Sequence, residues 1–223
     1  MNIGIMVAVE FDAFYTLYGE PIEKYEHGKI EIYKYNIHGK NVFVANSSAG
    51  QIRATIATTL LLELYKCDII LNYGVVGALS TQDLEALAVV ENVVYYEWDT
   101  SGIDPVEKGQ FELFDSIYIP TTKRLMEMAL EIDPKLEKVN LASGEKFVDD
   151  PAEKQNLKKT WNCDIVDMEG AGIAITCHIY GKEFLMIKAV SDTLAGGANE
   201  FLENLSKASR TVTKTLDKII EKL

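Results

Sequence analysis

The chain has 223 residues, of which 34 are acidic and 22 are basic, so its formal net charge is −12. Hydrophobic residues make up 48% of the chain, which is enough to bury a core and excludes a disordered protein. The acidic balance argues against a protein that coats nucleic acid, and no apolar run reaches the roughly 20 residues that span a bilayer.

The N-terminal half is predicted to combine strands with one long helix. Five strands are expected there, over residues 3–9, 30–37, 41–47, 68–73 and 88–96. The second and third flank a tight turn at residues 38–40 and predict a hairpin. A helix is expected over residues 51–65, and most of its apolar stripe should face the sheet. The stripe consists of Ile52, Ile56, Leu60 and Leu64.

The C-terminal half alternates helices and strands more clearly. Helices are expected over residues 121–132, 151–161 and 169–180 and from about residue 199 onward, and strands over residues 139–142, 164–168 and 184–190. The last helix has an apolar face made of Leu202, Leu205, Val212, Leu216, Ile219 and Leu223. This alternation predicts an α/β fold with a largely parallel sheet covered on both faces, which the hairpin makes mixed. No linker or repeat divides residues 1–223, so one domain is expected.

The cysteines and histidines indicate neither a disulfide framework nor a metal site. Cys67, Cys163 and Cys177 are odd in number, and each lies in or beside an apolar segment. They suit buried thiols in a reducing cytosol, and the N-terminus has no basic region or cleavage site of a signal peptide. The histidines have no metal-ligand spacing with a cysteine or with one another. We expect a cytoplasmic protein without a metal or another cofactor.

Three carboxylates follow predicted strands: Asp12, Glu169 and Asp192. Ligands of α/β sheets bind beyond the carboxyl ends of the strands, and the glycine-bearing segments 48–50 and 74–77, read as turns, would let a ligand approach the backbone closely. Taken alone, each carboxylate is more often a helix cap or a first-turn acid than part of a functional site. The residue pattern by itself therefore predicts only an α/β protein with carboxylates gathered at one edge of its sheet.

Several common chemistries lack their motifs in this chain. No G-x-G-x-x-G follows the first strand, and no G-K-[ST] or G-x-S-x-G sequence is present. These absences argue against nicotinamide chemistry, phosphoryl transfer and serine hydrolysis.

A resemblance to a known family is carried by two motifs, residues 166–172 (VDMEGAG) and residues 186–192 (MIKAVSD). Together they resemble the nucleoside phosphorylase/nucleosidase superfamily, and more closely its 5′-methylthioadenosine/S-adenosylhomocysteine nucleosidases. Supporting matches are Ile3-Gly4-Ile5, Ser48-Ala49-Gly50, Gly74 with Gly77, and Ser143-Gly144 with Phe147. The resemblance covers essentially the whole chain. It implies a single domain with a twisted mixed, partly barrel-like sheet flanked by helices.

The resemblance implies hydrolysis of the N-glycosidic bond of 5′-substituted adenine nucleosides, such as 5′-methylthioadenosine, S-adenosylhomocysteine and 5′-deoxyadenosine. Glu169 would accept hydrogen bonds from the ribose 2′- and 3′-hydroxyls, Met168 would pack against the sugar, and Asp192 would donate a proton to purine N7. The other implied pocket residues are Phe147, which would stack on the base, Val148, whose backbone would read the base edge, and Ser191, Ala49 and Val75. A buried acid with a raised pKa and a second carboxylate held ionised at a helix N-terminus are what this reaction requires.

The attacking nucleophile could be water or phosphate. Asp12 occupies the position of the family's water-orienting acid, which is usually a glutamate, and Glu10 is not expected to replace it because strand alternation from Val9 points it elsewhere. Phosphorylases of this fold surround phosphate with arginines, whereas this chain has three arginines in all and Asn72 precedes the Gly74 segment. Hydrolysis is therefore favoured. A phosphate-dependent purine nucleoside phosphorylase and a nucleoside-binding protein with weakened catalysis remain the alternatives.

The resemblance also implies a homodimer in which a loop of each subunit closes the 5′ pocket of its neighbour. The corresponding loop here is residues 98–104, where Trp98 and Ile103 lie in an otherwise polar stretch. We expect Ile103 to reach the partner's pocket. Residues 194–198 are shorter than the family's lid, so the identity of the 5′ substituent stays open. The expected partners are thus a small nucleoside and a second copy of the chain, without nucleic acid or membrane.

Overall fold

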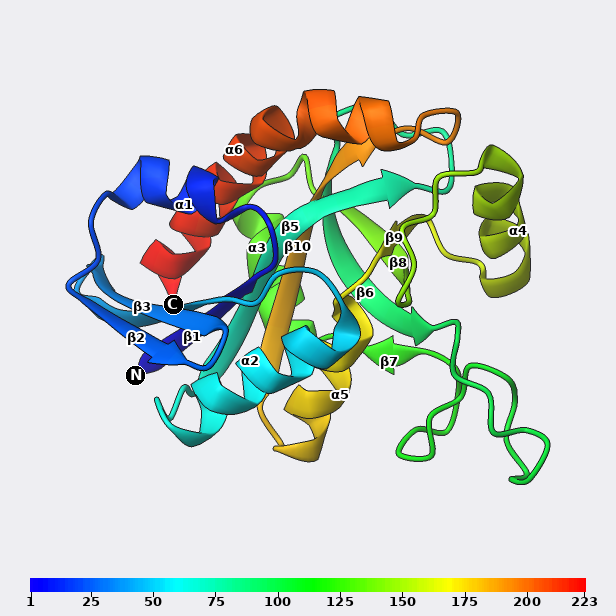
Figure 1. Ribbon diagram of the computed structural model, residues 1–223, viewed down its shortest axis with the longest axis horizontal. Coiled ribbons are helices and arrows are strands. Elements are labelled where there is room, and N and C mark those ends of the chain that lie inside the picture. Colours follow the sequence, from blue (N-terminus) through cyan, green and yellow to red (C-terminus); the bar gives the residue numbers. More distant parts are fainter.

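The computed structural model describes residues 1–223 and contains ten strands and six helices (Figure 1). The strands are β1 (Asn2–Val7), β2 (Glu23–His27), β3 (Ile30–Ile37), β4 (Lys40–Asn46), β5 (Ile69–Ala78), β6 (Leu87–Tyr95), β7 (Ile119–Pro120), β8 (Glu137–Ser143), β9 (Ile165–Asp167) and β10 (Glu183–Asp192). The helices are α1 (Phe11–Tyr18), α2 (Gln51–Glu63), α3 (Lys123–Ile132), α4 (Pro151–Trp161), α5 (Gly170–Ile179) and α6 (Ala198–Lys222).

The strands form one mixed sheet in the order β10-β6-β8-β9-β5-β1-β4-β3-β2, with β7 paired to β6. A further pairing between β5 and β10 closes the first five strands of this order into a ring. Strands β1, β4, β5 and β10 run parallel, and the predicted hairpin is the antiparallel pair β3–β4. The predicted α/β domain with a mixed, partly barrel-like sheet is confirmed.

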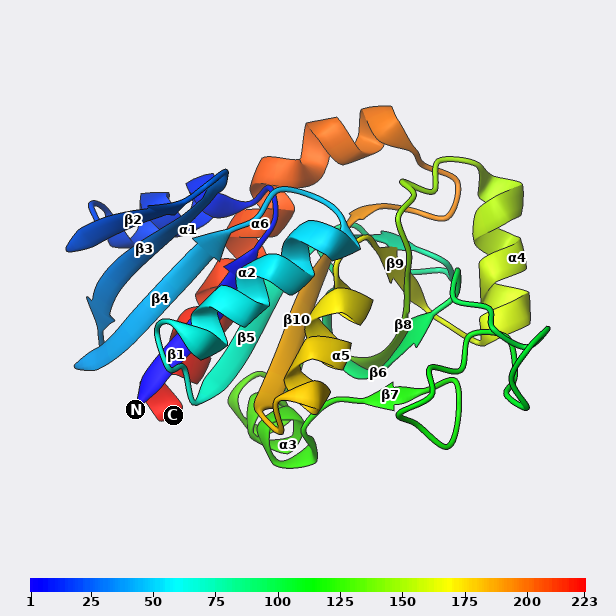
Figure 2. The same cartoon turned by 60° about the horizontal axis from the view of Figure 1, so that its bottom comes forward.

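Helices cover both faces of the sheet, as the alternating pattern predicts (Figure 2). On one face, buried residues of α2 and α5 such as Leu61 and Ile173 join the largest apolar cluster. On the other face, Phe14 of α1, Leu125 of α3 and Leu216 of α6 belong to a second cluster. Helix α4 packs at one end of the molecule and contributes to a third, smaller cluster. The carboxyl ends of the parallel strands are left between these layers.

The apolar stripe of α2 does not face the core, so that prediction is wrong. Ile52 is 72% exposed and Ile56 and Leu64 are also exposed, whereas Ala54, Ala57 and other residues of the opposite side are buried. Alanines let the helix backbone lie close to the sheet, and the larger side chains then have room only on the outside. The four-residue period identified an apolar stripe but not the surface that it contacts.

The glycines at 74 and 77 do not form a turn, because β5 continues through them to Ala78. A Cβ atom on Gly74 would lie 3.0 Å from the Glu10 carboxylate, and one on Gly77 would lie 3.0 Å from the Asp192 carboxylate. The strand therefore needs glycine at these two positions to make room for buried acids. The sequence predicts that a ligand approaches the backbone at this segment, and in the structure the groups that approach it are side chains of the chain itself.

Two smaller predictions concern the cysteines and the terminal helix. All three cysteines are buried and unpaired, as predicted. In α6, Val212, Leu216 and Ile219 are buried as predicted, but Leu202 is exposed because the buried part of the helix begins only at Ala208. None of the six helices combines the length and the apolar character needed to cross a membrane.

Candidate active site

A cavity of about 270 Å³ lies at the carboxyl ends of β1, β5, β9 and β10. Its lining is mostly apolar, with carboxyl groups at a few points. The lining residues are Ala8, Val9, Glu10, Ala49, Val75, Val76, Gly77, Phe147, Val166, Asp167, Met168, Glu169, Ser191, Asp192 and Phe201. Seven of the residues predicted from the sequence are brought together here: Ala49, Val75, Phe147, Met168, Glu169, Ser191 and Asp192.

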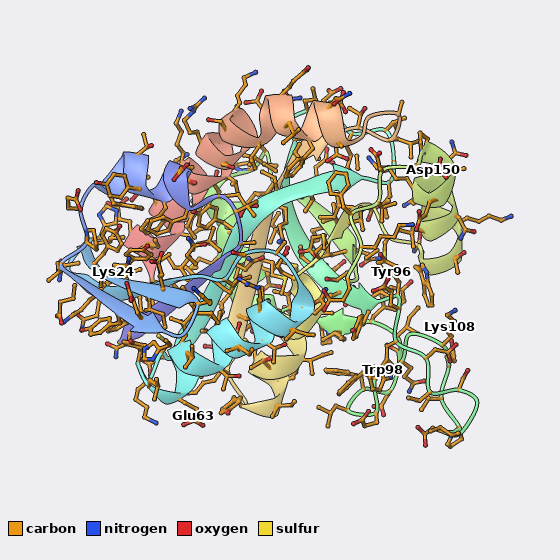
Figure 3. All side chains as sticks on the ribbon, viewed as in Figure 1. Lys24, Glu63, Tyr96, Trp98, Lys108 and Asp150 are labelled. Atoms are coloured by element: carbon orange, nitrogen blue, oxygen red, sulfur yellow. The ribbon has the colours of Figure 1, made fainter.

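The other three predicted residues lie elsewhere. Val148 is buried and lines a small adjoining hollow together with Phe147. Ile103 is 87% exposed on the loop after β6, which protrudes at the lower right of Figure 1 and carries Trp98 in Figure 3. Asp12 is exposed in the first turn of α1 and borders a separate hollow between α1 and α6. The cavity therefore does not contain Asp12.

Glu10 is the acid that enters the cavity from the N-terminal segment, contrary to the sequence prediction. Strand β1 ends at Val7, and Glu10 is the residue that precedes helix α1. Strand alternation no longer applies after Val7, so the side chain of Glu10 turns inward. Its two carboxylate oxygens accept hydrogen bonds from the backbone N–H groups of Val75 at 2.8 Å and Val9 at 2.9 Å. The missed helix α1 is the reason why the sequence placed Asp12 and not Glu10 in the cavity.

Glu169 occupies the N-cap position of α5 and is buried. Its carboxylate accepts a hydrogen bond of 2.9 Å from the backbone N–H of Gly50. Burial and, after it, the charge of Asp167 raise the pKa of Glu169, although Lys188 and the Gly50 N–H act in the opposite direction. The expectation that the helix N-terminus would favour the anion is outweighed, since a helix dipole contributes only about 0.3–1 kcal/mol.

A buried network of hydrogen bonds and one ion pair lies next to Glu169. Asp167 accepts a 2.8 Å ion pair from Lys188, and its other oxygen accepts hydrogen bonds from Ser143 and from backbone N–H groups at the start of α5. Lys188 is buried. Burial lowers its pKa, but the charges of Asp167, Glu169 and Glu10 raise that pKa by more, so the net change is a rise. A Cβ atom on Gly74 would lie 3.0 Å from Oε1 of Glu10 and 3.5 Å from Nζ of Lys188. Lys188 is thus ion-paired with Asp167, and the charges of Glu169 and Glu10 act on it as well.

Asp192 also lines the cavity and has a partner of its own. It is the last residue of β10, and its carboxylate accepts hydrogen bonds from Lys154 of α4 at 2.5 Å and from the hydroxyl of Ser191 at 2.9 Å. Burial raises the pKa of Asp192, and Lys154 and Ser191 oppose that rise. The direction matches the predicted need for an acid with a raised pKa. Lys154 was missed because a lysine in a polar helix looks solvent-exposed in sequence.

Aromatic residues border the cavity on its open side. Phe147 and Phe201 meet edge to face, with ring centroids 5.4 Å apart. Phe201 belongs to α6, so the terminal helix contributes an aromatic wall in the region after the short 194–198 segment. Flat apolar walls of this kind suit a purine ring.

Cations near the cavity are all engaged with the protein itself. Lys154 and Lys188 are paired with Asp192 and Asp167. None of the three arginines lines the cavity, and Arg53 donates to the carbonyl oxygen of Ser47. No three His, Cys, Asp or Glu side chains are arranged to hold a metal ion.

Comparisons with known proteins agree with this geometry. A family model described as the phosphorylase superfamily matches residues 2–221. A curated 5′-methylthioadenosine/S-adenosylhomocysteine nucleosidase of Staphylococcus aureus is 29% identical over 201 residues, which cover 87% of each protein.

Two solved structures are similar over the whole chain. The native futalosine hydrolase of Helicobacter pylori strain 26695 superposes with a TM-score of 0.93 at 27% identity and covers 100% of this chain and 98% of that one. The H. pylori 5′-methylthioadenosine/S-adenosylhomocysteine nucleosidase with butyl-thio-DADMe-Immucillin-A superposes with a TM-score of 0.92 at 27% identity, covering 100% and 99%.

Proposed function

The chain belongs to the phosphorylase superfamily, and from this premise we propose that it hydrolyses 5′-substituted adenine nucleosides to adenine and the ribose derivative. Candidate substrates are 5′-methylthioadenosine, S-adenosylhomocysteine and 5′-deoxyadenosine. The nucleosidase named among the curated relatives supports this class of reaction. The futalosine hydrolase among the similar structures makes futalosine a further compound to test.

The observation that carries hydrolysis rather than phosphorolysis is the position of Glu10. Its carboxylate accepts the Val75 N–H, a backbone donor that an anion in the cavity would need. A phosphate dianion placed there would meet a negative charge, and no arginine lines the cavity to offset it. A neutral water molecule meets no such repulsion and gains a base.

The proposed reaction uses three acids that line the cavity, Glu10, Glu169 and Asp192. The oxygen of a water molecule attacks C1′ of the ribose as the bond from C1′ to N9 breaks. Glu10 accepts the proton of the water, and Asp192 donates a proton to N7, so that the base leaves as neutral adenine. The Glu169 carboxylate accepts hydrogen bonds from the ribose hydroxyls, and Met168 packs against the sugar.

The mostly apolar lining explains how such acids would act efficiently. Charges interact more strongly where water is excluded. Phe147 and Phe201 would contact the base and shield it and Asp192 from solvent. Asp192 and Glu169 belong to separate ionic groups, the first around Lys154 and the second around Lys188. Different neighbours therefore act on the pKa of each, as an acid and a sugar-binding carboxylate require.

The test is incubation with each candidate nucleoside, with and without phosphate, followed by chromatography of the products. Adenine together with a free sugar supports the proposal. A sugar 1-phosphate formed only with phosphate would support the phosphorylase alternative, and tight binding without turnover would support the binding-protein alternative.

The assembly we propose is a homodimer. Ile52 and Ile56 of α2 and Ile179 of α5 expose apolar side chains around a shallow hollow of about 350 Å³, which Tyr95 and Phe111 also line. Burial of such a surface against a second copy would offset the repulsion between two chains of charge −12. Ile103 lies on the nearby loop after β6 and would reach the partner's 5′ pocket.

The compartment that we infer is the cytoplasm. The three unpaired thiols, all of them buried, suit a reducing environment.

A further inference from the structure

Lys154 is the feature that the proposed reaction does not explain. It lies in the first half of α4, yet its side chain is 0% exposed, which is rare for lysine. Its ammonium group donates to the Asp192 carboxylate at 2.5 Å, to the carbonyl oxygen of Thr193 at 2.8 Å and to that of Gly196 at 2.9 Å. An ammonium group has three N–H donors, and all three are used.

These contacts join two parts of the molecule that are far apart in sequence. Helix α4 covers one end of the sheet, and residues 193–197 connect β10 to α6 (Figure 1). The side chain of Asp149, just before α4, strengthens the same junction by accepting a 2.7 Å hydrogen bond from the backbone N–H of Ala198. The carboxyl group of Asp192 is thus held between Lys154 and Ser191.

A buried ion pair is weak evidence of a purely structural role. Removing two charges from water costs several kcal/mol per ion, and well-packed apolar residues of similar size often serve stability as well or better. A lysine kept at such a position is explained more directly by what it does to its partner. Here the partner is the acid that faces the cavity.

We propose that Lys154 is a positioning residue for the reaction, which fixes the orientation of the Asp192 carboxyl group and sets the pH range in which it can give up and regain a proton. This inference rests on the proposed function, in which Asp192 donates to N7.

The electrostatic reasoning follows from the groups around Asp192. Burial would by itself hold the carboxyl group neutral over a wide pH range, and Glu200 of α6 acts in the same direction. Lys154 of α4 and Ser191 of β10 favour the carboxylate. The other acids of the cavity, Glu10, Asp167 and Glu169, group around Lys188. A general acid is most effective when its pKa is close to the working pH, and Lys154 acts on that pKa by opposing the rise that burial causes.

The test is a titration of Asp192 that needs no substrate. The ¹³C resonances of the aspartate carboxyl groups are followed against pH, and the resonance of Asp192 is identified by its absence in Asp192→Asn. In Lys154→Met the titration midpoint of Asp192 should rise by about 1–3 pH units, the range expected for loss of an adjacent opposite charge. The alkaline limb of the kcat/KM profile should move by the same amount.

Lys158→Met is the matched control. Lys158 lies one turn further along α4 and pairs with Asp164 at 2.6 Å, partly exposed to solvent. This variant should leave the titration of Asp192 unchanged. Lys154→Gln is a second variant in case Lys154→Met does not fold, because an amide keeps two donors without the charge. It should shift the midpoint in the same upward direction.

The results separate this inference from the proposed function. An Asp192 midpoint that stays within about 0.3 pH units in both Lys154 variants would overturn the role of Lys154, whether or not any nucleoside is hydrolysed. A loss of activity without movement of the alkaline limb would reduce Lys154 to a purely structural residue and also overturn the inference. If the midpoint shifts in the Lys154 variants but the wild-type protein hydrolyses no nucleoside, only the proposed function is contradicted.

Discussion

Replacement of Glu10 by glutamine should abolish most hydrolysis, whereas Asp12→Asn should leave it unchanged. Glutamine matches the shape of glutamate but cannot accept the proton of an attacking water. Proton transfer to a positioned base contributes about 10²–10⁴-fold to a rate, so kcat should fall by that factor. Asp12 is exposed and lies outside the cavity, and its replacement should change kcat by less than about twofold.

The same substitution has a stability cost that follows from the hydrogen bonds. Both oxygens of Glu10 accept backbone N–H groups, from Val75 and Val9. An amide can accept only one of these, and its NH₂ group then faces a second donor. An unsatisfied buried donor costs about 1–3 kcal/mol. For a chain of this size, that corresponds to a fall in Tm of about 2–12 °C.

The assay measures adenine release from saturating 5′-methylthioadenosine, with Tm and nucleoside binding recorded on the same samples. These controls separate lost chemistry from lost folding, because a folded Glu10→Gln protein should still bind the nucleoside. The assignment of the base to Glu10 is refuted if this variant keeps more than a tenth of wild-type kcat. It is equally refuted if Asp12→Asn loses as much activity as Glu10→Gln.

Four further predictions use other parts of the molecule. Asp192→Asn should lower kcat about 10²–10⁴-fold in a folded protein. Wild-type kcat/KM should decline as pH rises through the raised pKa of Asp192, because only the protonated acid can donate. A variant that stays active would contradict the role of Asp192 as the acid. Glu169→Ala should impair cleavage of ribosides far more than of 2′-deoxyribosides, and equal losses would leave Glu169 a helix-capping role only. Ile103→Asp should weaken both dimerisation and catalysis in sedimentation and rate measurements, which a fully active micromolar monomer would contradict. A thiol reagent should react negligibly with the native protein, but with three thiols after unfolding. All three cysteines, Cys67, Cys163 and Cys177, are buried, and burial raises the pKa of Cys67 and of Cys163 to about 12.

Local patterns predicted most elements of the fold because each is recorded in a short stretch of sequence. The strand ending at Asp192, the helix that begins at Pro151 and the hairpin around residues 38–40 all have their signals within a few residues. Closure of the sheet through the β5–β10 pairing has no such local signal. It depends on contacts between residues more than a hundred positions apart, and only the family resemblance implied it.

The sequence predicted those residues of the candidate site whose place follows from a motif at a strand end. It missed Glu10, whose presence in the cavity depends on the direction of its side chain. Glu169 and Asp192 follow strands that are evident in the sequence, and the structure brings both into one cavity. Glu10 was excluded because β1 seemed to run to Val9, two residues past its true end. Because β1 ends at Val7, strand alternation does not govern the side chain of Glu10, and extending the alternation to Val9 was enough to exchange the two acids.

The arrangement of the two buried lysines suggests how the free protein is prepared for its substrate. Lys188 is ion-paired with Asp167, and burial together with the charge of Asp167 raises the pKa of the neighbouring Glu169. Ribose hydroxyls would donate to Glu169 and thereby favour its carboxylate form. At Asp192 bound substrate acts in the opposite sense, because N7 accepts a hydrogen bond only from the protonated carboxyl group and so favours the neutral form that burial also favours. Binding would therefore draw one carboxyl group toward its anion and keep the other neutral until its proton passes to N7. This opposite response explains why the cavity uses two separate ionic groups, around Lys188 and around Lys154, instead of one continuous network.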